Sequence, residues 1–389
     1  MEPINKKYTV TAQVLTPLSI GQGSEKDWVY GVDFLTAEDD DEQQWMYHLN
    51  IAKMIEVGVD VNRISSLFAN GRPQEIKQLV GNKLSQVSDF QMPLPINDTA
   101  GLANPIKTFL RNPLTNRPVL AGSSLKGAIR SVLFAYLAKD EDKRKLKEER
   151  NPNAYIFGEM TNGSDFMRFI RVGDFEFEKT CLVNTKIYNL HQENCEWEGG
   201  WKHKRTKRDK TTEENNTTTE YKPIGFNTLY ECLPPDAIAK GSIMFADGLF
   251  AHIANQPLYK EKQGIMSAPN IAAKLCSIIN AHTLTYLDKE IKFFATYKDG
   301  DCSTKIYNNL AEIKEECRRI HESEPLSCIL RMSAGAGFHT ITGDWLFADY
   351  TDAAQLDRKR GGELPKSRKI AVSGTKAFAP MGFIKLTFN

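Results

Sequence analysis

The chain has 389 residues, a formal net charge of +1, and 41% hydrophobic and 25% charged residues. This composition is typical of an ordinary globular protein, and the length allows one large domain or two of moderate size. The near-zero charge excludes a protein that attracts nucleic acid through an overall positive field. Any such partner must therefore meet local basic patches.

The sequence also argues against a membrane or secreted protein. No apolar run is long enough to span a bilayer, and residues 1–7 lack the apolar core of a signal peptide. The seven cysteines, an odd number at irregular spacings, indicate free thiols in a reducing compartment. We therefore expect a cytoplasmic protein with no membrane partner.

The N-terminal part predicts a strand followed by a glycine-bearing loop. Residues 8–16 alternate between apolar and polar side chains, which indicates a half-buried strand. The loop at residues 17–23 (PLSIGQG) contains Gly21 and Gly23. A single Gly-x-Gly is equally typical of a plain turn. The acidic run at 38–42 predicts a solvated hairpin tip.

Residues 50–104 differ from the strands around them. Helical periodicity occurs over 51–57, 61–69 and 74–84, and the segment 90–105 is rich in proline and asparagine. We interpret 50–104 as a helical insertion between two strands of a core, with 90–105 as a loop.

The segment 119–130 (VLAGSSLKGAIR) predicts a short strand, a small-residue turn and the start of a helix. Lys126 and Arg130 are four residues apart and share one face of that helix. The first amides of a helix lack intrahelical partners and carry the positive end of the dipole. Together with Ser123 and Ser124, these groups predict a phosphate site.

Two glycines of this segment strengthen the prediction. Gly122 lets the backbone approach a ligand closely, and Gly127 inside a helix costs about 1 kcal/mol relative to alanine. A helix with that cost usually needs close approach at that position. The alternative interpretation is a serine-capped surface helix with two solvated cations.

The aromatic segment 166–177 contains Arg168 and Arg171 among strand-like apolar residues. This pattern is found in sheets that bind single-stranded nucleic acid. It is also found in an edge strand with outward-facing cations.

Residues 183–224 contain too few apolar residues to bury a core of their own. Six Lys or Arg between 202 and 210 favour a protruding basic, thumb-like insertion that meets a phosphate backbone or a neighbouring subunit. An unstructured loop is one alternative. A zinc site is another, although its spacing fits no paired-ligand pattern; its ligands would be Cys181, His191, Cys195 and His203.

The C-terminal part predicts helices, a second glycine-rich turn and strands. Two amphipathic helices over 271–286 and 306–320 form a helical insertion at 255–322, with His282 on the apolar stripe as a core histidine. The turn at 330–339 (LRMSAGAGFH) leaves its backbone exposed. Strands at both ends and two glycine-rich loops indicate an α+β fold of ferredoxin-like type.

Three of these motifs together resemble the RAMP superfamily of CRISPR RNA-binding proteins: residues 17–23, 121–130 and 331–338. The order of parts is most similar to the subunit that caps the backbone filament of type III-A (Csm) effector complexes. Residues 365–368 (PKSR) and 380–386 (PMGFIKL) favour that subunit over the repeated backbone subunits. Ser333 stands where the family more often has glycine.

The resemblance implies a single RRM-like domain over 1–389 that binds the 3′ part of a CRISPR RNA (crRNA). It also implies docking on the last backbone RAMP subunit and on a small helical subunit, and a role in crRNA 3′-end maturation in antiviral defence. Target RNA and host nucleases stay open as further partners. The RNA-binding residues expected on these grounds are Gly21, Gly23, Gly122, Ser123, Ser124, Lys126, Arg130, Arg331, Gly335 and Gly337.

Sibling backbone subunits cleave target RNA with a metal and an aspartate that follows the first strand. Asp27 and Asp33 lie in that region, but their neighbours do not match the sibling pattern. A metal-assisted cut also needs an acid held beside a bound phosphate. We therefore expect a non-catalytic subunit without cofactor or metal. The alternative is a RAMP endoribonuclease, either a target-cleaving backbone subunit or a crRNA-processing enzyme.

Overall fold

The computed structural model describes residues 5–70, 72–96, 102, 104–193, 196–208, 217–222, 228–297, 301–332, 339, 367–374 and 376–389. Its centre is a five-stranded antiparallel sheet in the order β14-β17-β1-β13-β6. The strands are β1 (Lys6–Val14), β6 (Ile170–Val172), β13 (Ile238–Phe245), β14 (Ser327–Arg331) and β17 (Phe383–Phe388). The first strand lies where the alternation predicts it, with Val10, Ala12 and Val14 fully buried.

Two helices cover this sheet and complete its core. They are α4 (Gly122–Leu137) and α9 (Ile271–Thr296), which contact each other and β14. Leu125 and Ile129 of α4 and Leu275 of α9 share one buried cluster with the sheet. The apolar spacing of both helices was visible in the sequence, and α9 here belongs to the core of the fold.

A second sheet has the order β12-β8-β15-β16, with β9 paired to β8. Its strands are β8 (Cys181–Glu193), β9 (Glu196–Trp201), β12 (Thr228–Cys232), β15 (Arg368–Ser373) and β16 (Lys376–Pro380). The sequence predicts no core of its own for the segment 183–224, and its buried side chains do pack against elements from other parts of the chain. Its few apolar side chains are large, and Tyr188 and Trp201 are buried against α9 and α10 (Asp301–Ser323).

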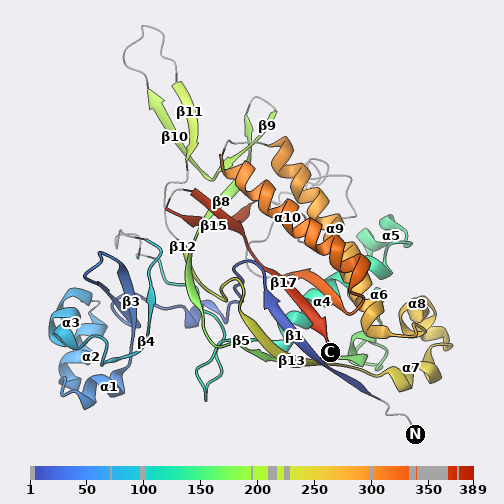
Figure 1. Cartoon of the computed structure of the whole chain (residues 1–389), viewed down its shortest axis with the longest axis horizontal. Helices are drawn as coiled ribbons and strands as arrows, with labels where there is room; N and C mark the ends of the chain where they lie inside the picture. The colour runs from blue at the N-terminus through green and yellow to red at the C-terminus, as the bar shows by residue number, and fades with distance from the viewer. Residues whose placement is uncertain are drawn as a thin grey trace.

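A hairpin extends from this second sheet. Strands β10 (His203–Arg208) and β11 (Thr217–Lys222) form a two-stranded sheet of their own. Figure 1 shows them projecting away from the rest of the molecule at the upper left. The predicted basic segment is therefore a protruding hairpin.

A separate lobe is built from β2 (Phe34–Glu38), β3 (Gln44–Leu49) and β4 (Ser88–Pro93). Between β3 and β4 the chain forms α1 (Ile51–Glu56), α2 (Val61–Ala69) and α3 (Pro73–Val80), close to the predicted helices. Figure 1 shows this lobe to the left of the central sheet. The prediction of a loop from residue 90 is wrong for β4, since Ser88, Asp89 and Gln91 hide its strand character.

The prediction of one strand over 166–177 is also wrong at its start. Phe166–Phe169 form a 3-10 turn, followed by β6 and by β7 (Phe175–Glu176). The Asp165 carboxylate accepts a hydrogen bond from the Met167 amide at 2.8 Å. This local cap fixes the turn before the strand begins.

The remaining elements are short and lie outside the two five-stranded sheets. They are β5 (Val119–Leu120), α5 (Lys143–Glu148), α6 (Pro152–Phe157), α7 (Asp247–Ile253), α8 (Gln263–Met266) and the 3-10 turns Ser24–Lys26, Gly81–Lys83 and Pro257–Lys262. None of the helices in the described part of the chain could cross a membrane.

Candidate nucleic-acid interface

The start of α4 differs in its capping from the serine-capped surface helix that is the alternative interpretation. The N-cap residue is Ala121, and no side chain caps the helix there. Ser123 and Ser124 lie inside the first turn, with Ser123 exposed and Ser124 half-buried. The serine-cap alternative is therefore wrong, and both hydroxyls lie beside the helix start.

Gly122 brings the helix start against the chain's own backbone. A Cβ built on Gly122 would lie 2.3 Å from the Val172 carbonyl oxygen and 2.7 Å from that of Gly173. The Gly122 amide donates to Asp174 Oδ1 at 2.7 Å. The close approach predicted at this glycine is therefore to the chain's own turn after β6 and not to a ligand. One of the first helix amides already has a carboxylate partner.

Two cations of the first turns of α4, Lys126 and Arg130, lie near Asp165, and Arg171 lies within electrostatic range of Lys126. Arg130 pairs with Asp165 at 3.3 Å, and its guanidinium lies 4.5 Å from the centre of the Phe157 ring. Burial lowers the pKa of Lys126. Arg130 and Arg171 lower it further, whereas Asp165 acts in the opposite direction. Lys126 therefore lies within electrostatic range of Asp165, Arg130 and Arg171, while a second carboxylate, Asp174, holds the Gly122 amide.

Gly127 leaves the helix backbone open between Lys126 and Arg130. A Cβ built there meets no atom within 4 Å in the described part of the chain, and the residue is exposed. The described fold therefore gives no packing reason for a glycine at this position. An open backbone between two cations suits the close approach of a phosphate chain.

The sequence model of the RAMP superfamily matches residues 11–259, which include this whole cluster. The chain belongs to the RAMP superfamily. Its predicted fold class, an α+β RRM/ferredoxin-like RAMP core with helical insertions and a protruding basic hairpin, is confirmed. No curated protein sequence matches it.

Two solved structures resemble this RAMP protein over nearly all of its length. One is a chain of a Csm–crRNA–target RNA ternary complex of a type III-A CRISPR-Cas system, with a TM-score of 0.66 and 16% identity, covering 98% of this chain and 100% of that one. The other is Csm5 of T. onnurineus, with a TM-score of 0.59 and 18% identity, covering 96% and 99%. At these identities the likeness shows a common fold.

The other predicted RNA-binding residues of the RAMP protein lie on elements other than α4 or beyond the described residues. Gly21 forms a bridge with Phe109, and Gly23 has a φ of 109°, a value that favours glycine in the turn before the first 3-10 helix. The Arg331 guanidinium, at the end of β14, lies 6.0 Å from the Tyr286 ring centre. Gly335 and Gly337 lie outside the described residues.

Both candidate catalytic aspartates already have partners in the chain. Asp27 is largely buried and forms an ion pair with Lys107. Asp33 Oδ2 accepts a hydrogen bond from the Val29 amide at 2.7 Å. These contacts give both carboxylates a role in holding the loops after β1.

The zinc alternative does not fit the strand that carries two of its ligands. Cys181 and His191 both lie on β8, ten residues apart along an extended strand, or roughly 33 Å. His191 Nε2 lies 3.0 Å from the Trp201 carbonyl oxygen. Cys195 lies outside the described residues, among which no group of three or more His, Cys, Asp or Glu could hold a metal.

A buried ion cluster that the sequence did not predict joins α9 to β15. Glu290 accepts from Arg368 Nε and Nη2, each at 2.7 Å, and His339 Nδ1 lies 2.6 Å from its Oε1. Burial alone would raise the pKa of Glu290, but Arg368 and His339 hold it well below its ordinary range. This cluster fixes His339, the exit of the glycine-rich turn, against α9.

Several residues of these clusters gave no local signal in the sequence. Asp165 and Asp174 lie more than thirty positions from the helix start that they contact, so spacing rules for one helix do not reach them. Arg171 was noted for its aromatic neighbours, not for its proximity to Lys126. Glu290 lies on a helix whose apolar stripe alone was apparent.

Proposed function

We propose that this RAMP protein is a non-catalytic RNA-binding subunit of a type III-A CRISPR (Csm) ribonucleoprotein that acts in antiviral defence in the cytoplasm. It caps the backbone filament, binds the 3′ part of the crRNA and aids its 3′-end maturation. The observation that carries the proposal is the pair of cations Lys126 and Arg130, with Arg171 within electrostatic range of Lys126, next to the open backbone of Gly127. Clustered cations beside an accessible backbone match the phosphates of RNA.

The similar structures support the same assignment. One of them belongs to a Csm complex with crRNA and target RNA, and the other is a Csm5 protein. By analogy, the partners of this chain are crRNA, with target RNA alongside it, a backbone RAMP subunit and a small helical subunit. Host nucleases that trim the crRNA are a further partner under this proposal.

The test of this function is the RNA that accompanies the protein. A tagged chain is purified from its native host at moderate salt, and the small RNA bound to it is sequenced. We expect spacer RNAs with a repeat-derived 5′ tag, together with other CRISPR subunits. A preparation without RNA, or with bulk cellular RNA, would contradict the proposal.

The non-catalytic part of the proposal has its own prediction. Because Asp27 and Asp33 are engaged within the chain, Asp27→Asn and Asp33→Asn should leave target-RNA cleavage by the reconstituted complex unchanged. The measurement is the cleavage rate with Mg²⁺ at matched crRNA occupancy. Loss of cleavage with RNA binding intact would favour the endoribonuclease alternative.

A further inference from the structure

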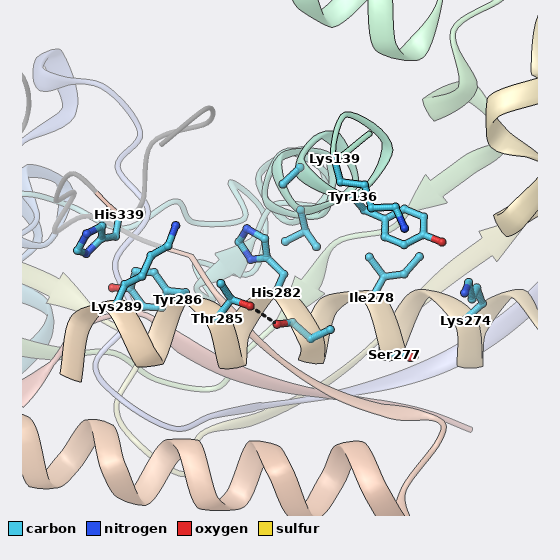
Figure 2. Close-up of a pocket in the computed structure, with 13 residues that line it drawn as sticks. Tyr136, Lys139, Lys274, Ser277, Ile278, His282, Thr285, Tyr286, Lys289 and His339 are labelled. Atoms are coloured by element: carbon cyan, nitrogen blue, oxygen red, sulfur yellow. Dashed lines mark hydrogen bonds between the residues drawn. The ribbon is translucent and has the colours of Figure 1, made fainter. Parts of the chain in front are cut away.

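Helices α4 and α9 cover only one face of the central sheet. They share a buried cluster with Val10 and Ala12 of β1, and they line a cavity of about 490 Å³ in which His282, predicted as a core histidine, is half-buried (Figure 2). Figure 1 shows α4 behind the sheet, with β1 and β13 toward the viewer. The second face of the sheet therefore needs its own account.

Helix α10 covers the β14 and β17 side of this second face. Ile329 of β14 is fully buried among residues of α10. Lys385, its partner on β17, forms ion pairs with Glu316 and Glu324 of α10 at 3.6 and 3.2 Å. The strands that α10 leaves uncovered are β1, β13 and β6.

The uncovered part, which we call the open face, is defined by strand pairing. Three rows of directly paired residues cross it: Arg171–Met244–Lys7, Ser242–Thr9 and Lys240–Thr11. Side chains of directly paired residues point to the same side of a sheet, so these rows share one face. Lys7, Thr9, Lys240 and Arg171 are exposed there.

The charges of the open face have one sign. None of the five strands of the central sheet contains Asp or Glu. Lys7, Lys240 and Arg171 have no ion-pair partner among the described residues, in contrast to Lys385 at the border with α10. The open face therefore attracts an anion.

The side chains between the cations favour RNA over a protein. Thr9 and Thr11 place hydroxyl groups in the middle of the face, and the aromatic residues of the five strands are all buried. Protein interfaces are enriched in aromatic residues and depleted of lysine. Ammonium and hydroxyl groups without rings suit phosphate and ribose oxygens, and they offer no platform on which a base could stack.

The positions of the cations suit an extended anion. Arg171 and Lys7 are two strand spacings apart, or roughly 10 Å, and Lys240 lies four residues from Met244 along β13, or roughly 14 Å. Arg171 is also within electrostatic range of Lys126, so the open face continues the cations of α4 around the edge of the sheet. A chain of phosphates fits this spread better than one small anion.

We infer that the open face binds the ribose–phosphate backbone of single-stranded RNA without regard to base sequence. Lys7, Lys240 and Arg171 pair with phosphates, and the hydroxyls of Thr9 and Thr11 donate to phosphate or ribose oxygens. This inference rests on the proposed RNA-binding function and adds a second surface to the cations of α4.

The first test measures RNA binding by the full chain after Lys7 and Lys240 lose their charge. Fluorescence anisotropy follows a labelled oligouridine and a mixed-sequence single-stranded RNA of the same length across a series of KCl concentrations. Lys7→Gln/Lys240→Gln should weaken binding of both RNAs alike, about tenfold at low salt. The slope of log affinity against log salt should fall by about 1.4 units, because each phosphate contact on a single strand contributes roughly 0.7.

Two further variants make this test specific. Lys7→Arg/Lys240→Arg keeps both charges and should have the wild-type affinity and slope. Lys292→Gln/Lys305→Gln removes two exposed lysines from α9 and α10 and should leave both quantities unchanged. If the first double variant melts at a lower temperature than the wild type, its two single variants replace it, each with an expected fall in slope of about 0.7 units.

Crosslinking then identifies what lies on the open face in the assembled complex. The photo-crosslinking amino acid p-benzoylphenylalanine in place of Thr9 should crosslink to RNA, whereas in place of Lys292 it should not. The crRNA and the target RNA are labelled in turn. A crosslink to crRNA identifies the guide as the occupant, and one that forms only after target RNA is added identifies the target; either result supports the inference.

Four results would overturn the inference. They are an unchanged salt slope in Lys7→Gln/Lys240→Gln, a loss of affinity for only one of the two RNAs, an affinity that the arginine variant does not retain, and an RNA crosslink at position 9 no stronger than at position 292. An unchanged slope together with weaker binding by Lys126→Ala would overturn this inference and leave the proposed function intact. A wild-type chain that binds neither RNA would overturn both.

Discussion

Asp165 offsets part of the repulsion between the cations near the start of α4. It pairs with Arg130 and raises the pKa of Lys126 against the opposing effects of burial, Arg130 and Arg171. Asp165 Oδ1 also accepts a hydrogen bond from the Met167 amide, which stabilises the turn before β6. One carboxylate thus joins the helix to the turn that precedes β6.

The role of Lys126 predicts a defined effect on RNA binding. Lys126→Ala should weaken binding to a similar extent for all RNA sequences and lower the slope of log affinity against log salt by about one unit. Fluorescence anisotropy across a series of KCl concentrations measures both quantities. Lys292→Ala, on the exposed side of α9, is the control, and a loss restricted to some sequences would contradict the phosphate contact.

The buried Glu290 predicts a large effect on stability. Glu290→Gln leaves the Arg368 guanidinium without its counter-charge and should lower the free energy of unfolding by about 3–5 kcal/mol at pH 7. The exposed Glu312→Gln on α10 should have little effect. Urea denaturation of the three proteins gives the comparison.

The same variant predicts a pH dependence. The pKa of Glu290 is lowered in the folded state, so its ionised form stabilises the fold above the unfolded glutamate pKa of about 4.3. That contribution is lost as the pH falls toward the lower, folded value. The stability difference between wild type and Glu290→Gln should therefore shrink below about pH 5, and a constant difference would contradict this account.

At the scale of the element, α4 contains two glycines whose surroundings differ. Packing within the chain requires a glycine at position 122 but not at position 127. Gly122 faces the carbonyl oxygens of Val172 and Gly173, whereas Gly127 faces open space in the described structure. The first glycine serves the fold. The second has a cost in helix stability that packing within the chain does not explain.

This contrast predicts opposite results for the two alanine variants. Gly127→Ala should raise the free energy of unfolding by about 1 kcal/mol and weaken RNA binding, because the added methyl group lies where the phosphate chain approaches. Gly122→Ala should destabilise the fold. Denaturation and anisotropy titrations measure both, and unchanged RNA affinity in Gly127→Ala and in the bulkier Gly127→Leu would show that RNA does not approach this face.

Elements with strong local patterns could be predicted from the sequence. The periodicity of α4 and the alternation of β1 each identify one buried face, and both lie where expected. β4 and the turn at Phe166 could not be predicted, because polar residues in the strand and the Asp165 cap override the apolar pattern. For β8, the covering helices α9 and α10 come from a distant part of the sequence, so its burial has no local signature.

At the scale of the whole molecule, the sequence predicts that Lys126 and Arg130 share one helix face. It does not predict which carboxylates lie beside that helix. The carboxylates of Asp165 and Asp174 reach the helix only through the placement of β6 beside β13. Likewise, the cavity of about 490 Å³ that α4 and α9 line exists only because these two helices, from different segments of the chain, pack together. Sequence patterns specify the faces of elements, while sites between elements require their arrangement.

Removal of the projecting hairpin should weaken binding without lowering the stability of the fold. Since β10 and β11 pair with each other in a sheet of their own, replacing residues 203–222 with a short glycine-serine linker should leave thermal stability nearly unchanged. The salt-dependent binding of RNA or of the neighbouring subunit should decrease, because the basic residues of 202–208 are largely removed. Thermal melting and complex reconstitution measure the two effects, and unfolding of the shortened chain would contradict the separation.

The position of β1 has a consequence for how the protein is made. Val10 has Gly241 as its neighbour on one side and Phe388 on the other. On the ribosome, β1 therefore emerges long before either partner strand, and its edges stay open to wrong partners throughout synthesis. A chain interrupted anywhere before Phe383 lacks the strand that seals this edge. Closure of the central sheet therefore depends on the synthesis of the last strand, β17.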